Sequence, residues 1–387
     1  MSIRPGKHLD ALPEYPMAGL KETRLRLQAS GVDVIDLSVG DADLAPPPAA
    51  VEALSRAARD PAMSRYPFQL GLVAFREAVA AWMYTRFGVS VDPMTEIVPL
   101  QGSKDGIAHL PLAFMDPGDA AIIPDPGYQA YRGPVVLAGG DPHLVPLRPE
   151  NDFLIPLESI PAEVLRRARI LYLNHPNNPT AAVAPDAYLR EAIEFCHRHD
   201  LILLHDNAYS EISFDGYLPP SILQFDGARE VAIEFHSISK TYNMTGWRLG
   251  WAAGRPELIR VLSRVKSFMD TGVFMGVQAA GVAALDSWAS WVPGNVAVFQ
   301  SRRDAAVAGL REAGFDVPLP RATMYLWVPV PGGGPSRDFA ERALEKEGIV
   351  IIPGSALGDG GEGFFRIALT VSEERLREAA VRLGRLT

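Results

Sequence analysis

Between about residue 49 and residue 285 the chain alternates helical patterns with short runs that are apolar throughout. Residues 120–123 and 170–173 are two such runs, and both are shorter than an ordinary helix. A strand whose residues are all apolar is typical of a parallel sheet that helices cover on both faces. The pattern therefore predicts an α/β domain over residues 49–285, built on a mainly parallel sheet.

The pattern changes at about residue 286. A long charged helical pattern follows at 296–313, then strand candidates at 325–328 and 365–368, and an amphipathic helix at 373–386. Prolines interrupt residues 1–48, which contain one helical pattern at 20–29. We predict that residues 1–48 and 286–387 together form a smaller α+β domain.

Composition narrows the classes of function. With 387 residues and 48% hydrophobic content the chain can bury a large core, and its length suggests two domains. Its net charge of −9 argues against nucleic acid or an anionic membrane as a main partner. The single cysteine, Cys196, lies in a helical pattern and is predicted to be core packing in a reducing compartment. There is no signal-peptide pattern and no apolar run of membrane length, so we expect a cytoplasmic protein.

The segment around Lys240 carries the most chemical information. Lys240 follows an apolar strand candidate at 231–236 and the hydroxyls of Ser237 and Ser239. A lysine desolvated at a strand end loses its proton more readily and becomes a nucleophile that can hold an aldehyde as a Schiff base. The two hydroxyls and Arg248 suit a phosphate. Pyridoxal 5'-phosphate carries both groups; the alternative is a tight turn in which the lysine is only structural.

Two further strand ends strengthen this interpretation. Residues 201–206 end in Asp206, with Tyr209 three residues later, and residues 169–174 lead into a turn that contains Asn178. Functional groups collect at the carboxyl ends of parallel strands. A carboxylate there can pair with a protonated pyridine nitrogen, while Asn178 and Tyr209 can donate to a phenolate oxygen. Taken alone, either strand end has a structural alternative, because strands often end in Asp or in Asn-Pro turns.

These motifs resemble those of the class I and II aminotransferases, the fold type I enzymes that use pyridoxal phosphate. The resemblance extends over nearly the whole chain and rests on Asn178-Pro179-Thr180, on Asp206 with Tyr209, on Ser237-X-Ser239-Lys240 and on Gly246-Trp247-Arg248. It implies a large domain with a mainly parallel, seven-stranded sheet between helices and a smaller α+β domain. It also implies a homodimer with shared active sites.

The resemblance assigns further cofactor contacts. Ser103 and Lys104 begin a helix after a glycine turn, and a helix N-terminus can bind a phosphate. Tyr128 matches an aromatic residue that stacks on the pyridine ring, and Tyr66 matches a tyrosine that reaches the partner's phosphate. The alternatives are a generic helix start for Ser103 and Lys104 and core packing for Tyr128.

The resemblance also implies substrate contacts. Arg366 matches the arginine that holds the substrate α-carboxylate in two parallel hydrogen bonds, although an arginine alternating outward on a strand is the plainer alternative. Gly40 matches a glycine that lets backbone approach the same carboxylate, and Tyr15 matches a substrate-side tyrosine. Asn178 is shared between substrate and cofactor, and Lys240 is expected to act as the base.

The function that follows is transfer of an amino group from an amino acid to a 2-keto acid such as 2-oxoglutarate, with ping-pong kinetics. The closest similarity is to LL-diaminopimelate aminotransferases of lysine biosynthesis, with alanine and aspartate aminotransferases as alternatives. Residues 66–71 lack the acidic residue expected near Tyr66 in the diaminopimelate enzymes, and Ala181 replaces the usual glycine after Thr180. Lys104 is a candidate for a distal carboxylate.

Other classes stay open or are disfavoured. A pyridoxal phosphate-dependent β-eliminating lyase shares the first half of the chemistry and remains an alternative. A regulator built on this fold would need a basic DNA-binding domain, for which the chain has no room. No metal site is expected, because His197 and His199 face apart on a helix and no acidic pair completes a ligand set.

Overall fold

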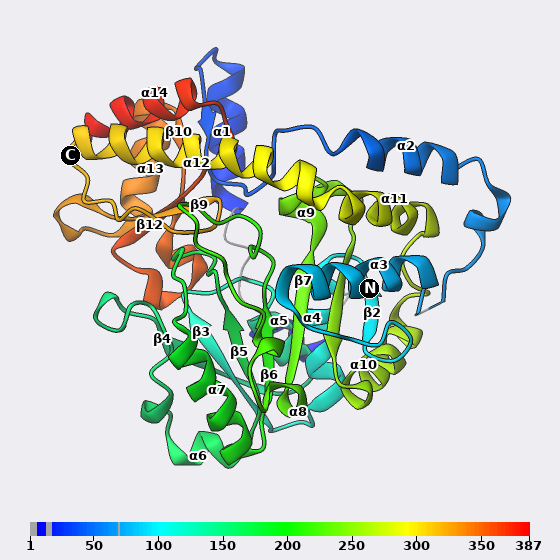
Figure 1. The fold of residues 1–387 in the computed structure, drawn as a ribbon. Helices are drawn as coiled ribbons and strands as arrows, with labels where there is room; N and C mark the ends of the chain where they lie inside the picture. Colours follow the sequence, from blue (N-terminus) through cyan, green and yellow to red (C-terminus); the bar gives the residue numbers. More distant parts are fainter. Residues whose placement is uncertain (1–5, 13–17, 69) are drawn as a thin grey trace, which may run out of the picture.

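The computed structural model describes residues 6–12, 18–68 and 70–387, and it contains one large sheet and two small ones (Figure 1). The order across the large sheet is β2 (Ile97–Leu100), β8 (Gly250–Gly254), β7 (Ala232–Ser237), β6 (Ile202–Asp206), β5 (Ala168–Asn174), β3 (Ala120–Asp125) and β4 (Asp141–Pro146). β8 runs antiparallel to both of its neighbours, β2 and β7, whereas the pairs among β7, β6, β5, β3 and β4 are all parallel. The predicted α/β class with a mainly parallel, seven-stranded sheet is therefore confirmed.

Residues of the central strands are buried on both faces, as their uninterrupted apolar runs predicted. Ile170, Leu171 and Tyr172 of β5 have essentially no exposed surface, because helices cover the sheet on each side. The parallel register places Asn174 at the end of β5 opposite Asp206 at the end of β6. Functional groups that follow these strands are thereby gathered at one edge of the sheet.

Fourteen helices surround the sheets within the described ranges. They are α1 (Ala18–Ala29), α2 (Pro48–Ala57), α3 (Val73–Phe87), α4 (Ser103–Phe114), α5 (Arg132–Leu137), α6 (Ala162–Leu165), α7 (Asp186–His199), α8 (Ala228–Val231), α9 (Ile238–Thr241), α10 (Pro256–Met269), α11 (Met275–Asp286), α12 (Trp288–Glu312), α13 (Ser336–Glu347) and α14 (Glu373–Gly384). Short 3-10 turns are η1 (Lys7–Ala11), η2 (Pro61–Ser64), η3 (Pro149–Asn151), η4 (Leu157–Ser159), η5 (Ile222–Gln224), η6 (Thr245–Trp247), η7 (Pro331–Gly333), η8 (Gly354–Leu357) and η9 (Asp359–Gly361). None of the helices in these ranges has the length and apolar character needed to cross a bilayer.

The small sheets lie beside the large one with their own apolar core. β11 (Ile352–Pro353), β12 (Phe364–Ala368) and β9 (Tyr325–Pro329) pair antiparallel in that order, and β1 (Ile35–Asp36) pairs parallel with β10 (Ile349–Val350). The helix predicted at 296–313 begins earlier, because α12 continues helical through Pro293. The proposed boundaries at residues 48 and 285 remain predictions.

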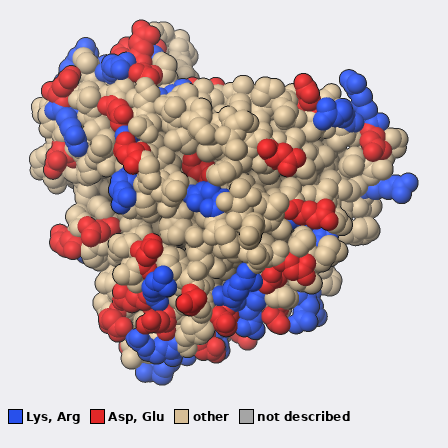
Figure 2. Space-filling view, in the orientation of Figure 1, with Lys and Arg blue, Asp and Glu red and all other residues tan. Residues whose placement is uncertain are grey.

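Two segments far apart in sequence join the large sheet to the small ones. Ser213, after β6, forms a β-bridge with Ala322, and the Thr323 amide donates to the Ile212 carbonyl at 2.8 Å. These bonds hold the stretch after Asp206 against the start of β9. The face seen in Figure 2 carries charges of both signs, mostly around its rim.

Candidate active site

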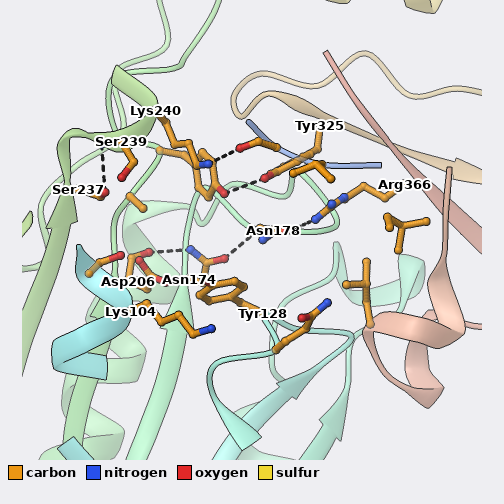
Figure 3. Close-up of a pocket in the computed structure, with 18 of the residues that line it drawn as sticks. Lys104, Tyr128, Asn174, Asn178, Asp206, Ser237, Ser239, Lys240, Tyr325 and Arg366 are labelled. Atoms are coloured by element: carbon orange, nitrogen blue, oxygen red, sulfur yellow. Dashed lines mark hydrogen bonds between the residues drawn. The ribbon is translucent and has the colours of Figure 1, made fainter. Parts of the chain in front are cut away.

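A cavity of about 240 Å³ opens where the carboxyl ends of β5, β6 and β7 meet β9 and β12 (Figure 3). Nearly all the residues predicted from the sequence line it. They are Gly40, Ser103, Lys104, Tyr128, Asn178, Asp206, Tyr209, Ser237, Ser239, Lys240, Arg248 and Arg366. Segments more than 300 residues apart thus converge on one pocket, which the sequence motifs alone could not place in space.

Two predicted residues are not brought to this cavity. Tyr66 is 71% exposed on the surface of the single chain and does not line the pocket. Its predicted place is in the partner's site, so its role stays a prediction. Tyr15 lies outside the described residues.

Lys240 reaches into the cavity from α9, the single turn that follows β7. Ser237 caps this turn, its hydroxyl accepting from the Ser239 amide at 3.2 Å. The Lys240 ammonium donates to the Gly40 carbonyl. Gly40 is a glycine for a steric reason: a Cβ there would lie 2.0 Å from the Tyr325 hydroxyl. The amine is therefore held at the cavity wall by backbone rather than by a carboxylate.

Asp206 presents one free oxygen to the cavity. Its Oδ2 accepts from the Tyr131 hydroxyl at 2.8 Å, whereas Oδ1 accepts no hydrogen bond from the described residues. Asp206 is only 4% exposed, and burial raises the pKa of its carboxyl to about 6, although the Tyr131 hydrogen bond and the charge of His205 lower it. A buried carboxylate with one oxygen that accepts no hydrogen bond is suited to bind a cationic N–H donor.

Asn174, which was not predicted as a site residue, ties two strand ends together. Its Nδ2 donates to the backbone carbonyl of Asp206 at 2.7 Å, and its Oδ1 accepts from the backbone N–H of Asn178 at 2.8 Å (Figure 3). The signal was present in the sequence, since Asn174 ends a strand four residues before Asn178. Tyr131, three residues after Tyr128, was missed in the same way.

Four groups at one end of the cavity suit an anion. Ser103 begins α4 after Gly102, and this helix start has no side-chain cap. Arg248 has a left-handed backbone with φ 56°, and its guanidinium donates to the Gln101 carbonyl at 3.2 Å. A Cβ on Gly102 would lie 2.4 Å from that guanidinium. Together with the hydroxyls of Ser237 and Ser239, these donors match a phosphate.

Arg366 lies on the opposite wall of the cavity. It donates to the Ser38 carbonyl at 2.6 Å and to Asn178 Oδ1 at 2.8 Å, and its guanidinium lies 4.2 Å from the centre of the Tyr325 ring. Its Nε has no hydrogen-bond partner in the described chain. A buried guanidinium with an unused donor is suited to a carboxylate. Because the Asn178 carbonyl accepts from Arg366, its Nδ2 is the group left to donate toward the cavity.

The hydroxyls of Tyr209 and Tyr325 are 3.1 Å apart. Burial raises the pKa of Tyr209 well above its usual value. Burial also acts to raise the pKa of Tyr325, but the charges of Arg366 and Lys240 and the bond to Tyr209 outweigh it, so this pKa is lowered. Tyr325 was not predicted, because nothing in its local pattern distinguishes it from a strand residue.

The donor set fits pyridoxal 5'-phosphate, the cofactor expected from the sequence. The free oxygen of Asp206 is complementary to a protonated ring nitrogen, and the cup formed by Ser103, Ser237 and Arg248 is complementary to the phosphate. The Lys240 amine is complementary to the aldehyde. Tyr128 lines the same cavity and offers a ring face.

Comparison with known proteins agrees with this geometry. Residues 32–383 match the family model described as aminotransferase class I and II. The chain is 49% identical to LL-diaminopimelate aminotransferase of Desulforudis audaxviator over 100% of both chains. Among solved structures it resembles a probable N-succinyldiaminopimelate aminotransferase from Thermus thermophilus (39% identity, TM-score 0.91, 95% of this chain and 99% of that one). It also resembles a single mutant of Thermus thermophilus aspartate aminotransferase (28% identity, TM-score 0.93, all of both chains).

These matches span nearly the whole chain, and the matched region contains the lysine, aspartate and arginine that meet in the cavity. The predicted resemblance is therefore confirmed. The chain belongs to the class I and II aminotransferases, a family of enzymes that use pyridoxal phosphate to exchange amino groups between amino acids and keto acids.

Proposed function

We propose that this aminotransferase binds pyridoxal 5'-phosphate at Lys240 and takes LL-diaminopimelate as its amino donor, with 2-oxoglutarate or a similar keto acid as acceptor. The observation that carries the cofactor assignment is the meeting of the Lys240 amine, the free oxygen of Asp206 and the donors of Arg366 in one cavity. The substrate assignment is supported by the full-length relative at 49% identity that bears this name.

The cofactor, when bound, supplies an aldehyde that condenses with amino groups and a ring that withdraws electrons from the carbon next to the nitrogen. Ser103, Ser237, Ser239 and Arg248 would hold its phosphate. Asp206 would keep the ring nitrogen protonated, because a buried carboxylate favours a cation beside it.

The chain's own residues then position the amino acid and move its proton. Arg366 binds the α-carboxylate and so fixes the direction of the Cα–H bond. The Lys240 amine is the base that removes the proton from Cα. Asn178 and Tyr209 would donate hydrogen bonds to the cofactor's phenolic oxygen, and the Tyr325 hydroxyl, 3.1 Å from that of Tyr209, orients it. The second half-reaction reverses these roles with a keto acid, which gives ping-pong kinetics.

The preference for a substrate with a second amino acid group is supported by two further polar residues of the cavity lining. They are Lys104 and Gln129. The lysine suits a distal carboxylate, and the glutamine carbonyl suits a distal ammonium group. Alanine offers no distal group for these side chains. Aspartate offers a carboxylate alone, and for that reason we place it behind diaminopimelate.

We also propose a homodimer in which Tyr66 reaches the partner's phosphate. Tyr66 and Phe68 are both largely exposed on the single chain, and their rings lie 6.4 Å apart. Phe268 of α10 is more exposed still. Large apolar side chains exposed in this way are typical of a protein interface.

Two measurements test the proposal. Borohydride reduction of the purified enzyme followed by peptide mapping should place a pyridoxyl group on Lys240, and Lys240→Ala should lose both the label and turnover. A label on another lysine would contradict the cofactor assignment. In a panel of amino acids with 2-oxoglutarate, LL-diaminopimelate should give the highest kcat/KM. A preference for alanine or aspartate, or pyruvate and ammonia released without a keto acid, would replace the substrate assignment by one of the alternatives.

A further inference from the structure

Lys266, on α10, has no exposed surface, which is unusual for a lysine. Its Nζ lies 2.5 Å from Asp105 Oδ2 and 2.8 Å from Asp270 Oδ2. Burial acts to raise the pKa of Asp105, but the bond to His109 and the charge of Lys266 outweigh it and lower this pKa to about 2. One buried ammonium group therefore holds two carboxylates together.

Asp105 connects this ammonium group to the predicted phosphate cup. It lies in the first turn of α4, two residues after Ser103, and its Oδ2 also accepts from the Gln101 amide at 2.9 Å. The Gln101 carbonyl in turn accepts from Arg248. The backbone between Gln101 and Ser103 is thus fixed from one side by Lys266 through Asp105 and from the other by Arg248.

Asp270 connects the same ammonium group to the surface segment that carries Tyr66. Its Oδ1 accepts from the Gly272 amide at 2.6 Å. Gly272 has φ +97°, and a Cβ there would lie 2.2 Å from the Phe68 carbonyl oxygen and 3.3 Å from Pro67 Cγ. The turn held by Asp270 therefore packs directly against the residues that follow Tyr66.

A metal ion is a poor explanation of this cluster. Asp105, His109 and Asp270 bring three potential ligand atoms within 4.8 Å of one another, the one such group in the described ranges. The Lys266 ammonium already lies at hydrogen-bond distance from both carboxylates and supplies the positive charge they need. The cluster is an ion-paired tie rather than a metal site.

We propose that Lys266 is a positioning residue that ties the phosphate-binding loop of one chain to the Pro67–Phe68 segment at the subunit interface. Cofactor affinity and self-association then depend on the same buried ion pair. This inference rests on the proposed cofactor and dimer. Through Lys266, the cofactor site of one chain is coupled to the segment around Tyr66 that completes the partner's site.

The test replaces Lys266 with methionine, which keeps most of the length of the side chain and removes its charge. Asp105 and Asp270 then repel each other, and both the loop and the turn lose their anchor. The dissociation constant of pyridoxal phosphate, measured by titrating cofactor-free enzyme, should rise about tenfold or more, the size of effect that follows loss of a residue that orients metal ligands. The kcat at saturating cofactor should stay within about twofold of the wild type. Sedimentation of the cofactor-free protein should show a weaker dimer.

Two further variants separate positioning from general stability. Arg382 also bridges two carboxylates, Asp33 and Glu378, but on α14, away from the cavity. Arg382→Met should lower the melting temperature without changing cofactor affinity. Asp270→Asn keeps the bond between Lys266 and Asp105, so it should weaken the dimer and leave cofactor affinity within about twofold.

The outcomes are distinct. If Lys266→Met binds cofactor as tightly as Arg382→Met does, the inference is wrong. If wild-type enzyme takes up no pyridoxal phosphate, the proposed function fails and the inference fails with it. If Lys266→Met does not fold, Asp105→Asn provides the same test, because it weakens the ion pair while its amide oxygen still accepts from Gln101. Unchanged cofactor affinity in that variant would equally overturn the inference.

Discussion

Replacing Arg366 with lysine tests how the substrate carboxylate is held. The arginine already donates to Ser38 at 2.6 Å and to Asn178 at 2.8 Å, and its ring contact with Tyr325 keeps the guanidinium plane fixed. A single ammonium nitrogen keeps the charge but cannot serve these partners and also offer a planar fork to a carboxylate. At least one charge-assisted hydrogen bond to the substrate is lost.

Such a bond contributes about 1.5–3 kcal/mol, so kcat/KM should fall roughly 10- to 150-fold. Both substrates carry an α-carboxylate, and the two half-reactions, followed separately by stopped-flow absorbance, should therefore lose the same factor. The amount of bound cofactor should not change. Arg385→Lys, at the exposed C-terminal end of α14, is the matched control and should behave as wild type. A loss below about threefold, or a loss in only one half-reaction, would refute the assigned role.

Three further predictions follow from the geometry of the cavity. The Asp206 pKa of about 6 exceeds its ordinary 3.8 because of burial, so the folded protein keeps a proton that the unfolded chain releases as pH rises. Between about pH 4 and 6 the free energy of unfolding of the cofactor-free enzyme should therefore fall by about 3 kcal/mol relative to that of Asp206→Asn, as measured by urea denaturation. The same pH dependence of the unfolding free energy in both proteins would contradict this. Tyr325→Phe removes one hydroxyl bond, worth about 0.5–1.5 kcal/mol, and should lower kcat/KM about two- to thirteenfold. The double variant with Tyr209→Phe should be no worse than the poorer single variant, and additive losses would show that the two hydroxyls act independently. An equimolar, randomly reassorted mixture of Tyr66→Ala and Lys240→Ala subunits should recover about a quarter of wild-type activity, because about half of its dimers are mixed and each mixed dimer has one intact site of two; no recovery would count against shared sites.

The residues at the ends of β5, β6 and β7 were predictable because a parallel sheet brings such positions to one edge. Asn178, Asp206 and Lys240 each follow a run of apolar residues. Such uninterrupted runs can be recognised in the sequence without knowledge of the fold. The functional assignment of Arg366 depended on family resemblance, since its strand alone is compatible with an outward-facing arginine.

Long-range contacts account for most of what the sequence did not predict. Tyr325 meets Tyr209 only because the segments around Ile212 and Thr323 pair across more than one hundred residues. Lys266 lies on an amphipathic helix, where a lysine is ordinarily on the solvent face. Its burial is explained by its ion pairs with Asp270 and with Asp105, and Asp105 comes from a helix far earlier in the chain.

The side-chain amide of Asn178 lies between the substrate-binding Arg366 and the proposed cofactor. Its side-chain carbonyl accepts a hydrogen bond from the guanidinium of Arg366, which leaves its NH₂ group to face the ring of the proposed cofactor. An anion arriving at that guanidinium changes the pull on the carbonyl and hence the polarity of the NH₂ group. If the proposed cofactor is bound, simple dicarboxylate inhibitors should consequently shift the pH at which its absorbance changes, before any chemistry occurs.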